Sequence, residues 1–169
     1  MIKIELKDGS LKEFESGIRA IDVANSISEG LARAIVGAKI NGEVKDLKTP
    51  INDDAKLEFV KFEDKDGKEV FWHTSTHVMA QAIKRLYPEA KLAIGPAIEN
   101  GFYYDIDLEH RLSPEDLEKI EAEMKKIVKE GHTLDRKVVS REEALERFRS
   151  IEEDYKIELI ENLPEDATI

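Results

Sequence analysis

The chain has 169 residues, 41% hydrophobic and 37% charged, which is enough apolar material for one ordinary domain or two small ones. It contains no run of about 18 apolar residues, which excludes a membrane span, and no cysteine, which excludes disulfides. The net charge of −11 argues against an extended phosphate-binding face but allows a small local contact with nucleic acid. Met1–Leu6 has no apolar stretch typical of a signal peptide, so we expect a cytoplasmic protein.

The negative charge is concentrated in the second part of the chain. Residues 1–62 carry 10 Lys+Arg and 11 Asp+Glu, whereas residues 63–169 carry 16 and 26. The change falls at the polar run 63–68 (EDKDGK), which contains a glycine and no apolar residue. Such a run is typical of a linker or a long turn. We therefore predict two domains, at residues 1–62 and 63–169.

The first domain reads as a small α+β unit. Ile2–Leu6 alternates apolar and charged residues, as a half-buried strand does, and Asp8-Gly9 predicts a hairpin to a return strand at Leu11–Phe14. Ala20–Ile27 has apolar residues at helical spacing, and Gly30 is expected to close that helix. No histidine, nucleophile–base pair or phosphate loop occurs here, so we expect a binding or positioning module. Further strands are predicted at 35–40, 43–45 and 57–60.

The first domain resembles a known module. The resemblance rests on the hairpin at Asp8-Gly9, the helix at Ala20–Ile27 and the stretch AKINGEVKDLKTPINDD at 38–54. These segments resemble the TGS domain, a β-grasp (ubiquitin-like) fold. TGS domains occur in several nucleotide- and RNA-handling proteins, so this likeness alone implies no particular activity.

A helix carrying two histidines is predicted from His73 through Leu86, before Pro88 stops it. At about 100° per residue, His77 lies about 40° from His73, whereas the apolar stripe is centred at about 212°. The histidines therefore face away from the apolar side of their own helix, which argues against histidines packed in the core. The stripe consists of Val78, Met79, Ala82, Ile83 and Leu86.

Three interpretations of the histidine face remain open. His73 and His77 can be an ordinary solvated pair, or they can face a cleft covered by a second layer of structure. Two histidines at i and i+4 can also bind one metal ion, but a third ligand would have to come from His110, His132 or a carboxylate. Neutral imidazoles near pH 7 can instead activate or position a water molecule.

The rest of the second region alternates short strands and helices. Tyr103 and Tyr104 are neighbours on a predicted strand and should point to opposite faces. Ser113 is predicted to cap a helix whose apolar stripe is buried, and Ser140 to cap another. The acidic runs at 142–146 and 152–154 favour solvated helix faces. Strands are predicted at 92–96, 101–107 and 133–139, a short helix at 155–160, and a strand beginning at 167–169, where the sequence stops. The apolar stripe of the helix after Ser113 consists of Leu117, Ile120, Met124, Ile127 and Val128.

The second region is similar to the editing domain of threonyl-tRNA synthetases. The similarity is carried by HTSTHVMAQAIKRLYPEAKLAIGPAIENGFYYDID at 73–107 and continues through LSPEDLEKIEAEMKKIV, REEALERF and DYKIELI. Together with the TGS-like module it covers essentially the whole chain and indicates the N-terminal region of such a synthetase. It implies an α+β fold in which a β-grasp domain precedes an α+β editing domain, with helices packed on an antiparallel sheet.

The resemblance implies proofreading. Serine differs from threonine by one methyl group, and losing such a contact is worth only ~1–3 kcal/mol, too little for faithful charging. A second pocket, too small for the threonine methyl, then hydrolyses serine from threonine tRNA. The reaction needs a positioned or activated water and donors for the developing oxyanion.

The family's site residues map onto four positions here. His73 and His77 form the HxxxH pair, expected to position or activate the water and to hold the 3′ adenosine. Tyr104, in GFYYD, would line the substrate pocket. Lys156, in DYKIEL, would act with the histidines by anchoring the substrate or the attacking water. On sequence alone Lys156 reads as a surface lysine, and the resemblance is what raises it to a site residue.

Other family features fall outside this sequence. The editing domain continues in the family with a CxxxH element, so we expect weak or no deacylation by the 169 residues alone. The aminoacylation core, with its ATP and zinc sites, and the domains expected to form a homodimer are also absent. We therefore expect no metal and no cofactor in this chain, and one partner, the serine-mischarged 3′ end of threonine tRNA. A non-catalytic adaptor and an HxxxH metallohydrolase are the alternatives.

Overall fold

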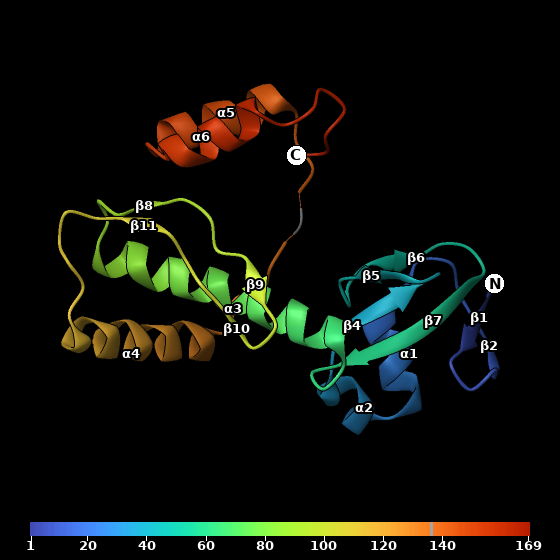
Figure 1. The fold of residues 1–169 in the computed structure, drawn as a ribbon. Helices are drawn as coiled ribbons and strands as arrows, with labels where there is room; N and C mark the ends of the chain where they lie inside the picture. The colour runs from blue at the N-terminus through green and yellow to red at the C-terminus, as the bar shows by residue number, and fades with distance from the viewer. Residues whose placement is uncertain (136) are drawn as a thin grey trace. The chain divides into compact units, whose positions relative to one another are not determined.

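The computed structural model describes residues 1–135 and 137–169, which divide into two compact units, Met1–Trp72 and His73–Ile169 (Figure 1). The division between the two units falls inside a helix. The sequence predicts a domain boundary at 62/63, and this boundary stays a prediction. No helix in the described ranges is both long and apolar enough to cross a membrane.

The first unit is built on a five-stranded sheet with the order β2-β1-β7-β4-β5. The two central strands β1 and β7 run parallel, and every other neighbouring pair in this sheet is antiparallel. A separate two-stranded pair, β3 with β6, lies outside it. The strands are β1 (Ile2–Leu6), β2 (Leu11–Phe14), β3 (Ile18–Arg19), β4 (Ile35–Ile40), β5 (Glu43–Lys45), β6 (Pro50–Ile51) and β7 (Ala55–Lys61).

One helix, α1 (Ala20–Ile27), supplies the helical part of the core of this sheet. Its Ala20 and Val23 pack with Ile4 and Leu57, all four being 1% exposed or less. A sheet with parallel central strands and one helix packed in its core is the β-grasp arrangement that the resemblance to the TGS domain implies. The expected end at Gly30 is wrong, because the Ser28 side chain accepts a hydrogen bond from the Gly30 N–H and starts a second helix, α2 (Glu29–Ala34).

The polar run at 63–68 is not a linker over its length. Helix α3 spans Lys65–Leu86, eight residues earlier than the start predicted at His73. Asp64 begins it, because its main-chain oxygen accepts the Lys68 N–H at 3.0 Å. Gly67 permits this early start: a Cβ on Gly67 would lie 1.7 Å from the Lys61 carbonyl oxygen. The glycine that suggested a loop therefore allows the helix to pack against the end of β7.

A narrow β-ribbon forms the strand part of the second unit. The strand predicted at 92–96 is wrong except for Leu92, and the one predicted at 101–107 forms only at its two ends, because Gly95-Pro96 interrupts the pairing. Between the pieces, the Ala93 N–H donates to Asp105 O at 3.0 Å and the Asp105 N–H donates to Ile94 O at 2.9 Å. β8 (Lys91–Leu92) pairs antiparallel with β11 (Ile106–Asp107), and β9 (Ala97–Ile98) pairs antiparallel with β10 (Gly101–Phe102).

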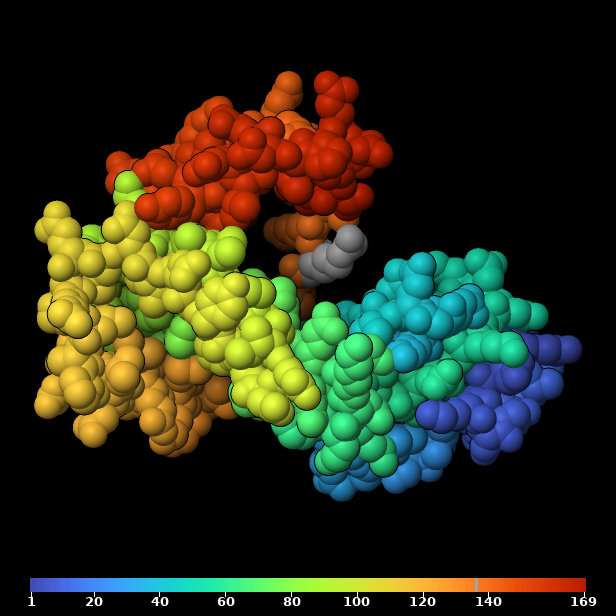
Figure 2. Space-filling model, viewed as in Figure 1, coloured from blue at the N-terminus to red at the C-terminus, as the bar shows by residue number. Residues whose placement is uncertain are grey.

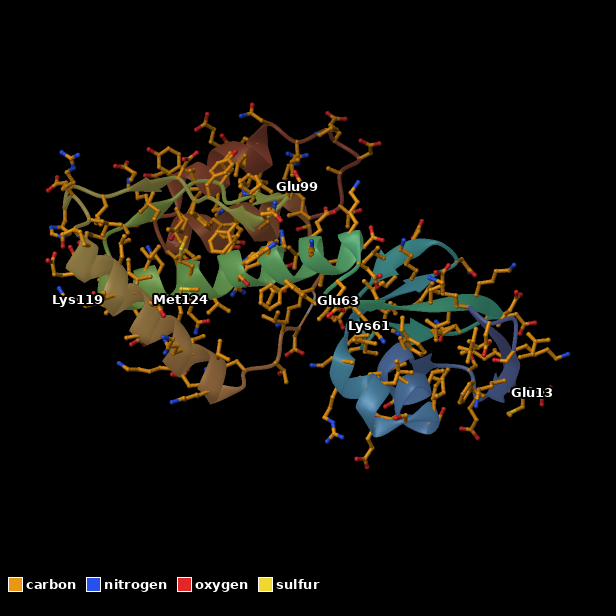
Figure 3. The ribbon with its side chains drawn as sticks, turned by 60° about the horizontal axis from the view of Figure 1, so that its bottom comes forward. Glu13, Lys61, Glu63, Glu99, Lys119 and Met124 are labelled. Atoms are coloured by element: carbon orange, nitrogen blue, oxygen red, sulfur yellow. The ribbon has the colours of Figure 1, made fainter. Side chains whose placement is uncertain are left out.

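Helix α4 (Pro114–Glu130) begins at its Ser113 cap and ends at Gly131 as predicted, with a reciprocal capping box between Ser113 and Asp116. Within this unit it runs along one side of α3, and the ribbon runs along the other (Figure 1). Met124, labelled in Figure 3, lies between α4 and α3. The predicted stripe is too wide, because a surface helix buries only a narrow face: Leu117 and Val128 are 59% and 67% exposed. The core consists of Ala82, Ile83, Ala90, Leu92, Ile120 and Ile127.

Two helices follow, α5 (Arg141–Ser150) and α6 (Asp154–Glu161). Ser140 caps α5 as predicted by accepting the Glu143 N–H at 3.1 Å. The strand predicted at 133–139 is wrong for its described residues, and Arg136 lies outside them. One ladder-like bond is present there, from the Val139 N–H to Ile169 O at 2.8 Å, and no strand is assigned at 167–169 either.

Candidate functional site

The two histidines of α3 contact each other through their imidazole nitrogens. His73 Nε2 and His77 Nε2 are 3.1 Å apart, and the rings meet edge to face with centroids 4.8 Å apart. One Nε2–H must donate to the lone pair of the other Nε2, so at least one ring is neutral in this arrangement. Both rings are exposed, while Ala82 and Ile83 face the core, as the helical spacing predicts. Leu86, the last residue of the predicted stripe, is 36% exposed.

The surroundings of His77 favour its neutral form. Partial burial lowers the pKa of His77 below its ordinary value, and the charges of His73 and Lys156 lower that pKa further. A neutral imidazole retains a lone pair that can accept a proton from water near pH 7. The charge of Lys156 thus acts on His77, although the two are far apart in sequence.

Lys156 owes its place to contacts between α6 and the ribbon. Its Nζ donates to the Ala93 carbonyl at 2.8 Å, and the Tyr155 hydroxyl donates to Asp107 Oδ2 at 3.0 Å. Lys91 forms an ion pair with Asp154 beside them. In the space-filling view the red surface of α5 and α6 adjoins the yellow-green surface of the ribbon (Figure 2). Polar side chains of α6 thus hold this helix against the ribbon.

Tyr104 lies on the ribbon and packs on its backbone. The ring lies over Gly95, where an added Cβ would come 2.3 Å from Tyr104 Cδ2. Burial, and then the charge of Glu153, raise the pKa of the Tyr104 hydroxyl. Tyr103 is 49% exposed while Tyr104 packs against the core cluster, so the two point to opposite sides as expected. The described contacts of Tyr104 are with the ribbon and the core, and none joins it to either histidine.

An ion pair between Lys84 and the buried Glu153 was not predicted from the sequence. Lys84 Nζ lies 2.9 Å from Glu153 Oε1, and Glu153 is only 7% exposed. The prediction that 152–154 is a solvated face is therefore wrong for Glu153. The one available signal was the position of Lys84, which lies about 20° from His73 on the same helix face at 100° per residue. Nothing in the sequence named Glu153 as its partner.

The remaining histidines have partners away from this pair. His110 Nε2 lies 2.8 Å from Asp116 Oδ2, and His132 Nε2 lies 2.6 Å from Glu130 Oε2. In the part of the chain that the structure describes, no three His, Cys, Asp or Glu side chains gather as metal ligands would. His73 and His77 thus offer two nitrogen ligands to a metal ion.

The comparisons with known proteins agree with this layout. Residues 2–61 match the model of the TGS domain. All 169 residues align with threonine–tRNA ligases: 66% identical with that of Clostridioides difficile (strain 630), covering 26% of it, and 60% identical with that of Finegoldia magna, covering 27%. The ligase of Acetivibrio thermocellus is 56% identical, with 27% of its length covered. The chain thus spans about a quarter of these relatives. It is therefore related over its whole length to the threonine–tRNA ligase family, and its residues 2–61 form a TGS domain.

Proposed function

We propose that this chain is the proofreading part of a threonine–tRNA ligase, which hydrolyses the ester that joins serine to threonine tRNA. The observation that carries the proposal is the contact between His73 and His77, in which at least one ring must be neutral. The charge of Lys156 contributes to the lowered pKa of His77. Kinship along the whole chain with threonine–tRNA ligases supplies the substrate class.

Hydrolysis is needed because binding alone discriminates poorly between serine and threonine. A pocket built for threonine gains only ~1–3 kcal/mol from the extra methyl group, so serine is charged too often. A second site must then remove serine and spare threonine. Only the single-stranded 3′ end of the tRNA has to enter, which is compatible with a chain of net charge −11.

The chemical step is water attack on the ester carbonyl carbon. The neutral imidazole of the pair takes a proton from the water, a C–O bond forms, and negative charge develops on the carbonyl oxygen. The ester C–O bond then breaks, and the ribose oxygen takes the proton that the imidazole had accepted from the water. Serine and uncharged tRNA are the products. Water or substrate must displace the direct contact between His73 and His77 to reach the lone pair that it occupies.

The other two predicted residues take supporting roles. Lys156 provides the positive charge, which anchors the substrate or the attacking water and stabilises the developing oxyanion. Tyr104 lines the wall of the substrate site from the ribbon. No metal or cofactor takes part in this scheme. ATP, zinc and a homodimer interface would belong to other domains of such a ligase, and a cytoplasmic location stays a prediction.

A deacylation assay tests the proposal directly. Threonine tRNA charged with serine would be incubated with the 169-residue chain and with the same chain fused to the remaining length of the Clostridioides difficile relative. We expect release of serine by the fusion, weak or no release by the chain alone, and no release of threonine. His73→Ala in the fusion should abolish the release.

His132→Ala is the matched control, because His132 pairs with Glu130 away from the site. It should leave the rate unchanged. An inert fusion would overturn the hydrolase proposal and leave the chain as a non-catalytic adaptor. Stoichiometric zinc in the purified chain, lost on His77→Ala, would instead favour a metallohydrolase.

A further inference from the structure

Lys84 is held at one point by a complete set of acceptors. Its ammonium group donates to Pro88 O at 3.0 Å and to Ala90 O at 2.9 Å, and it lies 2.9 Å from Glu153 Oε1. An ammonium group has three N–H donors, so each donor has one acceptor. Two acceptors belong to the turn that follows α3, and the third belongs to the start of α6. Lys84 therefore fixes α6 to the helix that carries His73 and His77.

Glu153 fixes the start of α6 from its other side. Its main-chain oxygen accepts the Lys156 N–H at 3.0 Å, and its own N–H donates to Phe148 O at 3.0 Å. Glu153 therefore holds the first turn of the helix by its backbone and holds Lys84 by its side chain. Lys156 lies in this first turn, and its Nζ position depends on where that turn is held.

The second carboxylate oxygen of Glu153 is buried and has no hydrogen-bond partner among the described residues. A buried acceptor without a donor is costly, so such an oxygen needs a reason. It is sealed from solvent, so a ligand cannot reach it unless α6 moves. Burial, and then the charge of Glu153, raise the pKa of the Tyr104 hydroxyl, although this hydroxyl gives the free oxygen no hydrogen bond.

We infer that Lys84 and Glu153 are a positioning pair, which holds the first turn of α6, and with it Lys156, against the ribbon. Neither residue touches the substrate. The pair acts through α6, which the bond from Lys156 Nζ to Ala93 O also joins to the ribbon. This inference rests on the proposed hydrolysis for its kinetic consequence, but not for its structural one.

The kinetic test uses the fusion protein. Lys84→Met should lower the kcat of serine release by about 100-fold, because a small displacement of a positioned group is that costly, with little change in KM. Lys84→Arg keeps a cation within reach of the same acceptors and should retain most of the rate. The matched control is Arg85→Met, which removes the neighbouring cation of α3 and its ion pairs with Glu123 and Glu130. It should leave kcat nearly unchanged.

A second readout does not depend on activity. The pKa of His77 would be measured by NMR titration in the same variants of the chain. Lys84→Met should raise it, because Lys156 moves away, whereas Arg85→Met should not. If the fusion is inert but this difference appears, the hydrolase proposal fails and the positioning pair stands. Equal behaviour of Lys84→Met and Arg85→Met in both readouts would overturn the pair. Should Lys84→Met fail to fold, Glu153→Gln, which keeps the shape of the side chain, provides the same two comparisons.

Discussion

The two units differ in what they bury. In Met1–Trp72 every buried side chain among the described residues is apolar, whereas His73–Ile169 buries Thr76, Asp116 and Glu153 as well. Thr76 bonds to its own helix, and Asp116 bonds to the cap of α4 and to His110. Of these three side chains, only Glu153 bonds to a residue far away in the sequence, Lys84. One of its carboxylate oxygens has no hydrogen-bond partner.

Under the proposed function, this difference separates a scaffold from a site. An apolar core is non-directional and is satisfied by residues of about the right size. A buried charge must find one partner in one geometry, and natural chains keep such demands where position matters. The first unit therefore has an apolar core only, whereas the second also buries the charge of Glu153 against Lys84.

The largest expected effect lies in the apolar core of the first unit. Leu57→Ala, at a side chain 1% exposed, should lower the free energy of unfolding by about 2–5 kcal/mol through lost burial and a cavity. Urea unfolding followed by Trp72 fluorescence measures it, because this single tryptophan packs edge to face with Phe62 and Phe71. Leu11→Ala, at a residue 66% exposed, is the control and should change little. Equal losses for both would contradict an apolar scaffold.

The next effect tests the ribbon of the second unit. Gly95→Ala places a methyl group 2.3 Å from the Tyr104 ring, so the ring must move or the ribbon must open. Overpacking of this kind costs about 1–3 kcal/mol. Thermal unfolding measures the loss, and serine release by the fusion protein should fall with it.

Gly9→Ala provides a contrast for that substitution. An added Cβ at Gly9 meets nothing within 4 Å, although its φ of +82° strains any other residue. Gly9→Ala costs stability only through backbone strain in a hairpin of the first unit. This substitution should therefore leave serine release unchanged. A fall in release for both variants would mean that general loss of stability, and not the position of Tyr104, limits the reaction.

A smaller effect compares one helix cap in each unit. Ser28 accepts the Gly30 N–H at 3.1 Å at the start of α2, and Ser140 accepts the Glu143 N–H at 3.1 Å at the start of α5. Replacing either by alanine should cost about 1 kcal/mol in thermal unfolding. Only Ser140→Ala should also slow serine release, because α5 leads directly into the segment that holds Lys156. Similar kinetics for the two variants would remove the distinction between scaffold and site at this level.

The sequence predicted what depends on local patterns. Alternation at Ile2–Leu6, the turn at Asp8-Gly9 and the caps at Ser113 and Ser140 specify their elements through neighbours a few residues away, and the structure has them. The spacing of His73 and His77 likewise placed both rings on one face.

What the sequence could not give depends on distant partners. Gly67 looked like a loop residue, because nothing nearby shows that the Lys61 carbonyl would approach it. Glu153 looked solvated, because its partner Lys84 lies far back in the chain and acidic residues are usually exposed. A strand at 133–139 needs a neighbour to complete its ladder, and Val139 makes a single bond to Ile169. Long-range pairing therefore accounts for these errors.

The smallest expected effect is a shift in the titration of His77. Because the pKa of His77 is depressed in the folded chain, the unfolded chain binds a proton first as the pH falls below about 6.5. Stability should therefore decrease with falling pH, from the unfolded pKa down to the folded one. Lys156→Met removes one cause of the depression, so NMR should find a higher pKa for His77 and a weaker pH dependence of stability. Lys129→Met, on the exposed end of α4, is the matched control and should shift neither. An unchanged His77 titration in Lys156→Met would mean that the cation does not act on this ring, and the contrast between scaffold and site would lose its electrostatic part.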